Sequence, residues 1–99
     1  MPATRARRSC LAVPGSSPKM LSKAASLPAD QIFLDLEDSV APRAKAPARA
    51  AVIEALNERD WSGKTVTVRI NAVETKWAAD DIRAVVEGAG SHIHCIMIP

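Results

Sequence analysis

Short apolar runs of strand length alternate with longer amphipathic runs along this chain, and that alternation constrains the fold more than any other feature. β-Branched and aliphatic runs predict strands, and apolar residues spaced three and four apart predict helices. Strand, helix, strand, helix, strand, helix, strand is the order of parallel strands with crossover connections, which is an α/β fold. The predicted strands cover residues 9–13, 31–36, 64–71 and 93–98, and the predicted helices cover residues 19–27, 44–58 and 77–88.

Each predicted helix has a recognisable boundary or buried face. The turn at residues 14–18 precedes the first helix, with Ser16 or Ser17 as its N-cap. The spacing in the second helix predicts a buried face of Ala48, Ala51, Val52, Ala55 and Leu56. In the third helix we expect Ile82, Val85 and Val86 to face inward, with Gly88 or Gly90 ending the helix.

The residue pattern of the two central predicted strands distinguishes between the common α/β folds. No G-x-G-x-x-G or G-x-x-x-x-G-K-[ST] sequence follows a strand, which leaves a flavodoxin-like sheet or a (β/α)8 barrel. Each strand has an aliphatic face and a face that becomes polar towards its carboxyl end. In residues 31–38 the aliphatic face is Ile32, Leu34 and Leu36, and the other face is Phe33, Asp35 and Glu37. In residues 64–71 the aliphatic face is Val66, Val68 and Ile70, and the other face is Thr67, Arg69 and Asn71. A barrel has aliphatic side chains outward and polar ones at its mouth, whereas a doubly wound sheet is more often apolar on both faces. The pattern therefore favours a TIM barrel.

The length of the chain limits how much of a barrel it holds. A (β/α)8 barrel takes about 250 residues, whereas this chain has 99. We therefore expect residues 9–99 to be the N-terminal portion of a barrel, roughly three and a half of its β/α units, truncated in the fourth strand. Residues 1–8 are expected to be a separate basic arm.

The charge and composition of the chain limit the kinds of binding partner that we expect. Residues 1–29 carry five basic side chains and no acidic one, which is typical of a solvated leader, a nucleic-acid contact or a binder of phosphorylated small molecules. With no Tyr and a single Phe, the sequence lacks the interleaving of aromatic and basic residues that is typical of nucleic-acid sites, so we expect no nucleic-acid partner. The uncharged residues 91–99, and the longer uncharged stretch 88–99 that contains them, are too short to span a membrane. Two cysteines are too few for a disulfide scaffold, and we expect a cytoplasmic protein.

Three carboxylates, Asp35, Glu37 and Asp38, follow one another at the end of the second predicted strand. One interpretation is a solvated loop in which Asp38 or Ser39 caps the next helix. The other is support for a divalent metal and its waters, because Mg²⁺ prefers oxygen ligands. Asp35 lies within an apolar run, where a buried carboxylate requires a partner.

Arg69 stands on the polar face of the third strand, near its carboxyl end. A guanidinium there can hold a carboxylate or a carbonyl with two hydrogen bonds, or form an internal ion pair with Asp35 or Glu37. Asn71, two residues on, is in a position to orient either arrangement. The turn at residues 14–18, followed by Lys19 and Lys23, is a weak signal for an anion site.

Four segments carry a family resemblance: RSCLAVPGS at residues 8–16, LDLEDSVAP at 34–42, VRIN at 68–71 and IMIP at 96–99. Together with Lys45 and Arg49 they resemble the HpcH/HpaI aldolase and citrate lyase β-subunit family, and within it the L-malyl-CoA/β-methylmalyl-CoA lyases. The resemblance implies a Mg²⁺-dependent TIM-barrel enzyme that cleaves such a CoA ester to glyoxylate and an acyl-CoA, or condenses them. A citryl-thioester lyase like the citrate lyase β subunit, or a non-catalytic truncated paralogue acting as a binding module, are the alternatives.

The resemblance also implies roles for individual residues. Arg69 matches the arginine that binds the substrate's carboxylate and carbonyl oxygens, with Asn71 beside it. Lys23, Arg8 and Ser17 fall on the edge that faces CoA, and the LDLED carboxylates line the metal side of the mouth. The direct Mg²⁺ ligands, a Glu and an Asp, are expected beyond Pro99, so these 99 residues are expected to be inactive alone. A homo-oligomer, a trimer or a hexamer, is expected for the full-length protein.

Overall fold

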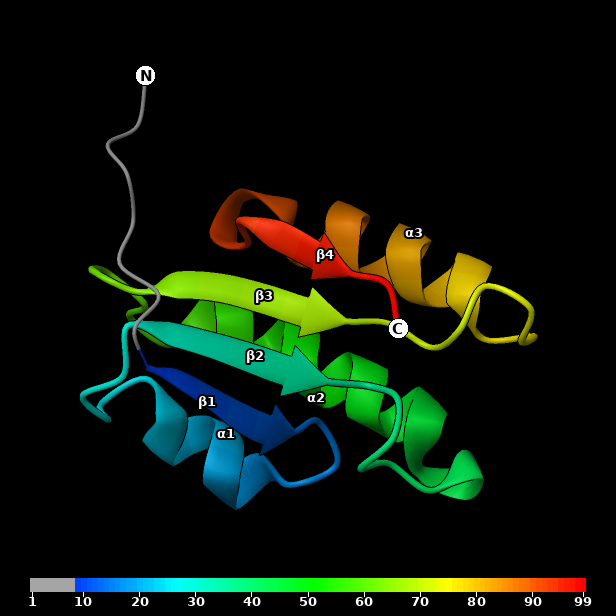
Figure 1. Cartoon of the computed structure of the whole chain (residues 1–99), viewed down its shortest axis with the longest axis horizontal. Coiled ribbons are helices and arrows are strands. Elements are labelled where there is room, and N and C mark those ends of the chain that lie inside the picture. Colours follow the sequence, from blue (N-terminus) through cyan, green and yellow to red (C-terminus); the bar gives the residue numbers. More distant parts are fainter. Residues whose placement is uncertain (1–8) are drawn as a thin grey trace.

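Four parallel strands form one sheet in the order β1-β2-β3-β4 in the computed structural model, which describes residues 9–99. The strands are β1 (Cys10–Pro14), β2 (Gln31–Asp35), β3 (Thr65–Arg69) and β4 (Cys95–Met97). All four point the same way, so their carboxyl ends lie at one edge of the sheet (Figure 1). The predicted α/β order is confirmed, and residues 1–8, with Arg8 and the predicted basic arm, lie outside the described residues.

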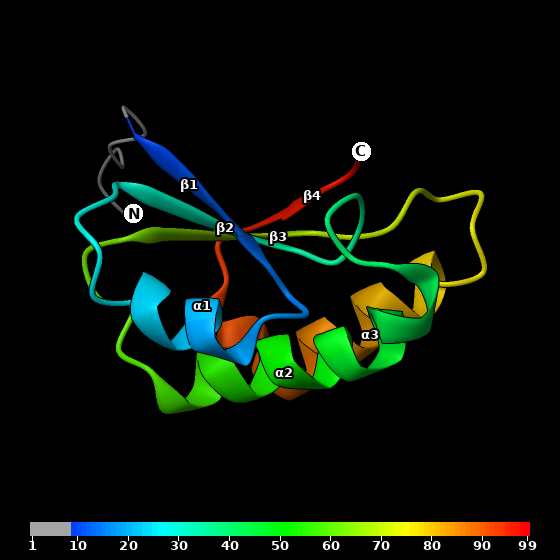
Figure 2. The same cartoon turned by 90° about the horizontal axis from the view of Figure 1, so that it is seen from below.

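Three α-helices connect the strands: α1 (Pro18–Ala24), α2 (Lys45–Glu58) and α3 (Ala78–Ala89). Short 3-10 turns, η1 (Pro42–Ala44) and η2 (Gly90–His92), precede α2 and follow α3. Figure 2 shows the three helices together on one face of the sheet. We call the opposite face the helix-free face. Within residues 9–99, no helix has the length and apolar character needed to cross a membrane.

The core lies between the sheet and the helices. The aliphatic side chains predicted for the outer face of the central strands are all buried there: Ile32, Leu34, Leu36, Val66, Val68 and Ile70. Val52 and Leu56 of α2 and Val85 of α3 are buried from the helix side. The strand pattern therefore predicted correctly which face the helices cover.

The β1–α1 turn is built as its sequence indicates. Ser17 is the N-cap of α1, and its hydroxyl accepts a hydrogen bond from the backbone N–H of Met20 at 3.3 Å. Gly15 donates its N–H to the Asp35 carbonyl oxygen at 2.8 Å. A Cβ at Gly15 would lie 2.7 Å from that oxygen, so only glycine fits this close approach. The turn is thereby fixed against the carboxyl end of β2.

The predicted face of α3 is wrong for two of its three residues. Val85 is buried, but Ile82 is 40% exposed and Val86 is 50% exposed. The buried residues are Ala78, Asp81, Val85 and Ala89. Hydrophobic spacing selected the aliphatic residues of this helix, whereas the structure buries a carboxylate, Asp81, that has partners just after β3 and on α2. The helix ends at Ala89, and its C-cap is Gly90, the second of the two glycines proposed for its end.

Candidate functional site

The carboxyl ends of β2 and β3 place a carboxylate beside a guanidinium. Asp35 ends β2, Arg69 ends β3, and the parallel register pairs them directly. Arg69 Nε donates to Asp35 Oδ1 at 2.8 Å, and Arg69 Nη2 donates to Asp35 Oδ2 at 2.9 Å. Two parallel charge-assisted bonds of this kind are among the stronger side-chain interactions. The internal ion pair that the sequence left open is therefore present.

Asp35 is held by its own loop as well as by Arg69. The backbone N–H groups of Glu37 and Ser39 each donate to it at 2.9 Å, and the Ser39 hydroxyl donates at 2.6 Å. Burial by itself would raise the pKa of Asp35, but the bonds from Arg69 and Ser39 outweigh that effect. The pKa of Asp35 is lowered well below its ordinary value. Asp35 is therefore a fixed negative charge at neutral pH.

Arg69 keeps donors that Asp35 does not use. A guanidinium carries five N–H groups, and Asp35 accepts from one on Nε and one on Nη2. The bond to Asp35 raises the pKa of Arg69 above its ordinary value. Glu37 lies 3.6 Å from Arg69 Nε, and the Arg69 side chain is 24% exposed. The remaining N–H groups are thus on a permanently charged side chain that solvent and solutes can reach.

A hollow of about 270 Å³ opens in front of this pair. Its wall has a charged part, made by Asp35, Asp38 and Arg69, and an apolar part made by three residues of β1 and β2. The residues that line it are Ala12, Pro14, Phe33, Asp35, Asp38, Ser39 and Arg69. Two of the three predicted carboxylates and the predicted arginine therefore lie together at one concave site, on the helix-free face.

Lys45 is a residue of this site whose role sequence reasoning did not identify. It is buried at the start of α2, and its Nζ donates to the backbone oxygens of Leu36 at 3.1 Å and Glu37 at 2.9 Å. The Trp77 ring lies 5.2 Å from the same ammonium. Lys45 therefore holds the backbone of the loop that carries Glu37 and Asp38. Its spacing of three from Ala48 was the available signal, because it places Lys45 on the buried face of the helix.

Asn71 turns away from the arginine that it was expected to orient. Its backbone N–H and its Nδ2 donate to Asp81 Oδ2, at 3.0 and 2.6 Å. Asp81 Oδ1 accepts from Arg49 Nε at 3.0 Å and Nη2 at 2.8 Å. Asn71 is thus part of a buried network that joins the segment after β3 to α2 and α3. The substrate-binding role predicted for Asn71 stays a prediction.

Two of the residues predicted to face CoA lie at α1. Ser17 uses its hydroxyl to cap that helix, and Lys23 is an exposed residue of its last turn. Neither side chain lines the hollow at Asp35 and Arg69. Their roles at a CoA ligand remain predictions, and Arg8 precedes the described residues.

The described residues do not fit a magnesium site. Within residues 9–99, no group of three or more His, Cys, Asp or Glu side chains could hold a metal ion. Both oxygens of Asp35 already accept from Arg69 and the loop, whereas Mg²⁺ requires a near-octahedral set of oxygen ligands. The acidic cluster is therefore part of an ion-pair network, and its predicted role near a metal stays a prediction.

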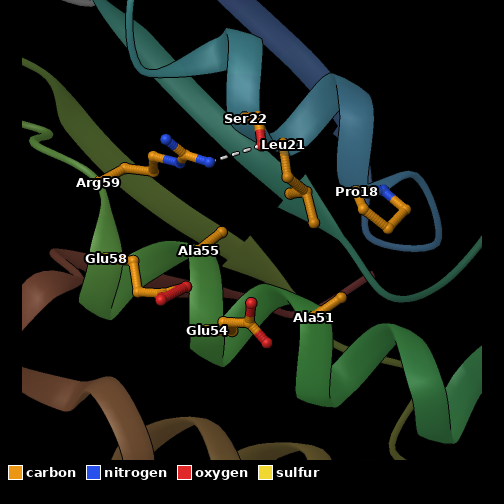
Figure 3. A pocket seen from close by; sticks show the side chains of 8 residues that line it. All are labelled: Pro18, Leu21, Ser22, Ala51, Glu54, Ala55, Glu58 and Arg59. Carbon is orange, nitrogen blue, oxygen red and sulfur yellow. Dashed lines mark hydrogen bonds between the residues drawn. The ribbon is translucent and has the colours of Figure 1, made fainter.

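A second hollow, of about 140 Å³, lies between α1 and α2 and has a different character (Figure 3). Its floor is apolar, with Leu21, Ala51 and Ala55, and Arg59 reaches across to donate to the Ser22 hydroxyl at 2.9 Å. Figure 2 shows α1 and α2 on one face of the sheet. Arg69 alternates along its strand with the core residues Val68 and Ile70, so it belongs to the helix-free face. This groove is an inter-helix surface, separate from the charged hollow.

Taken together, a parallel sheet with helices on its outer face and a charged site at the carboxyl ends of its strands defines an α/β-barrel class of protein. Residues 8–99 match the family model described as HpcH/HpaI aldolase/citrate lyase. The chain belongs to the HpcH/HpaI aldolase/citrate lyase family. The family resemblance of the four sequence segments is thereby confirmed, and so is the fold class of a partial barrel.

Relatives of known activity support the same assignment. L-malyl-CoA/beta-methylmalyl-CoA lyase of Cereibacter sphaeroides is 48% identical over 98 residues, which cover 99% of this chain and 31% of that protein. Citrate lyase subunit beta of Escherichia coli is 45% identical over 85 residues, covering 86% of this chain and 28% of that protein. The chain spans about a third of the length of the curated relatives that it matches.

Solved structures match the fold over the same region. CitE from Mycobacterium tuberculosis, in complex with magnesium, acetoacetate and coenzyme A, has a TM-score of 0.74 and 34% identity, covering 95% of this chain and 33% of that chain. Citrate lyase beta subunit from M. tuberculosis, complexed with oxaloacetate and magnesium, has a TM-score of 0.73 and 33% identity, covering 94% and 40%. The four-stranded sheet is therefore a fold shared with these proteins.

Proposed function

We propose that this chain supplies the carboxylate-binding part of a lyase that cleaves or forms a carbon–carbon bond next to a CoA thioester. The observation that carries the proposal is the charged hollow at Asp35 and Arg69. Arg69 is oriented by Asp35 through Nε and Nη2, has further N–H groups that Asp35 does not use, and lines the hollow. A small oxo acid placed there would receive its hydrogen bonds from a guanidinium that is already fixed, so little conformational entropy is lost on binding.

The chemistry of the proposed reaction makes use of this fixed charge. Cleavage of a malyl-type thioester leaves an oxo acid whose carboxylate, and whose developing carbonyl oxygen, are negatively polarised. A preorganised cation beside those oxygens stabilises the transition state more than water does. The proposed substrates are malyl-CoA or β-methylmalyl-CoA, with Mg²⁺ as the cofactor, on the names of the relatives. The described residues supply no metal ligand set, and we therefore expect the 99 residues alone to show no turnover.

Substitution of Arg69 tests the proposal. In the protein as its gene encodes it, Arg69→Lys should lower kcat/KM for malyl-CoA by at least a hundredfold, about 2.7 kcal/mol, because lysine cannot form the bidentate fork. Arg83→Lys, on the exposed surface of α3, is the matched control and should leave kcat/KM unchanged. Near-wild-type turnover by Arg69→Lys, in a protein with a wild-type unfolding curve, would contradict the role of Arg69.

A citryl thioester is the second candidate substrate, because a citrate lyase beta subunit matches the chain almost as closely. Assays with malyl-CoA and with a citryl thioester, on the same preparation, decide between the two. Turnover of neither, by a folded protein that binds no CoA thioester, would support the non-catalytic alternative.

A further inference from the structure

An aromatic ring shares the wall of the charged hollow with Arg69. Phe33 lies on β2 two residues before Asp35, on the same face of the sheet, and it lines the hollow. The Arg69 guanidinium carbon lies 5.1 Å from the centre of the Phe33 ring. A guanidinium over a ring face is attracted by the ring's negative electrostatic potential. Phe33 therefore contributes to the orientation of Arg69 from a side that Asp35 does not contact.

The neighbour of Phe33 on β1 leaves part of its ring uncovered. The parallel register pairs Phe33 with Ala12, whose side chain is a single methyl group. Ala12 is exposed, and it lines the hollow together with Pro14. Ala12, Pro14 and Phe33 thus give the hollow an apolar part that adjoins its charged part. A hollow with one charged and one apolar wall suits a ligand with the same two parts.

We propose that Phe33 is a specificity-determining residue, whose ring receives the apolar carbon chain of a short-chain carboxylate while the carboxylate meets the unused N–H groups of Arg69. The inference rests on the proposed function, since it takes Arg69 as the carboxylate partner. It adds the substrate class: an acid bound by its carbon skeleton as well as by its charge. Affinity then rises with chain length, by up to about fourfold for each methylene that contacts the wall.

A series of straight-chain 2-oxo acids measures this directly. Glyoxylate, pyruvate, 2-oxobutyrate and 2-oxopentanoate are titrated by calorimetry into the protein as its gene encodes it. The wild-type affinity should increase along the series. Phe33→Ala should lower the affinity for 2-oxopentanoate by about tenfold or more and that for glyoxylate by less than about threefold. Phe33→Tyr, which retains the ring, should restore the wild-type series.

Filling the hollow provides a test that does not depend on removing the ring. Ala12→Phe places a second ring beside Phe33, and it should abolish the preference for the longer acids while glyoxylate still binds. This variant keeps the inference falsifiable if Phe33→Ala does not fold. An equal loss for every acid in Phe33→Ala, or an unchanged series in Ala12→Phe, would overturn the role of Phe33.

The two proposals fail in different ways. If Arg69→Lys reduces binding of all four acids but affinity does not depend on chain length, the proposed function stands and the role of Phe33 is wrong. If Arg69→Lys leaves the binding of all four acids unchanged, Arg69 is not the carboxylate partner and both proposals are wrong.

Discussion

Two arginine–aspartate pairs stand at either side of the same sheet and differ in what surrounds them. Asp35 and Arg69 meet on the helix-free face, whereas Asp81 and Arg49 meet between α3 and α2. Both aspartates are buried, and both arginines bind through Nε and Nη2 at 2.8–3.0 Å. The arginines are 24% and 18% exposed. Distance and burial alone therefore do not distinguish the two pairs.

The difference lies in the remaining polar groups and in the adjoining space. The second oxygen of Asp81 accepts from the backbone and side chain of Asn71, so the network joins α2, α3 and the segment after β3. The Asp35 pair instead borders a hollow of about 270 Å³, with an aromatic ring and a second carboxylate, that of Asp38, on its wall. A pair enclosed by structure stabilises the fold, and a pair that borders a hollow is available to a ligand.

The enclosed pair should show the largest effect on stability. Asp81→Ala leaves the Arg49 guanidinium and the donors of Asn71 without their acceptor, which costs about 3–5 kcal/mol for a buried pair. The free energy of unfolding in urea measures it. The double variant Asp81→Leu with Arg49→Met should recover much of that loss, because no uncompensated charge is left. A loss below about 1 kcal/mol in Asp81→Ala would mean that the network is not structurally important.

Substitution in the β1–α1 turn, which packs against the carboxyl end of β2, should give the next largest loss of stability. In Gly15→Ala the new Cβ would lie 2.7 Å from the Asp35 carbonyl oxygen and 3.0 Å from Val52 Cγ2. We expect a loss of about 2–3 kcal/mol, because the strand end must shift to relieve the overlap. Gly63→Ala is the matched control: no atom lies within 4 Å, but φ is +80°, so the loss should be about 1 kcal/mol. Equal losses at both glycines would contradict the close approach at Gly15.

Acid should reduce the contribution of the Asp35–Arg69 pair to the free energy of unfolding over a defined range of pH. The pKa of Asp35 is lower in the folded state than the ordinary value of about 3.9 expected in the unfolded chain. Its contribution is therefore fully present above that unfolded value and is lost as the pH falls towards the folded one. We expect about 2 kcal/mol of the unfolding free energy to disappear below about pH 4. In Asp35→Asn this acid-dependent component should be absent, and an unchanged pH profile in that variant would refute the assignment.

Much of the fold could be predicted because aliphatic and polar residues alternate within the strands themselves. The alternation of Val66, Val68 and Ile70 with polar residues marks the face that the helices cover, and burial confirms it. The pairing of Asp35 with Arg69 was within reach for the same reason. Both residues end strands that are neighbours in the sheet, and a buried carboxylate requires a cation or donors.

The enclosed network could not be predicted from spacing. Asp81 lies beside Ile82 in a helix, and hydrophobic periodicity assigns the buried position to the isoleucine. The burial of Asp81 depends on Arg49, 32 residues earlier, and on Asn71, 10 residues earlier. Such partners are identified only once the elements are in place. Phe33 was likewise assigned to a face, but its position beside Arg69 follows from the register of β2 with β3.

The two faces of α3 supply the smallest and most discriminating test of the comparison. If the Asp81 network fixes the rotation of this helix, its aliphatic residues are exposed as a consequence, and truncating them should change little. Val86→Ala should alter the unfolding free energy by no more than about 0.5 kcal/mol, because Val86 is 50% exposed. Val85→Ala, one residue away and fully buried, is the matched control and should cost about 2 kcal/mol. Equal losses at the two valines would mean that α3 packs through the face that its hydrophobic pattern predicts, and that Asp81 is not what orients it.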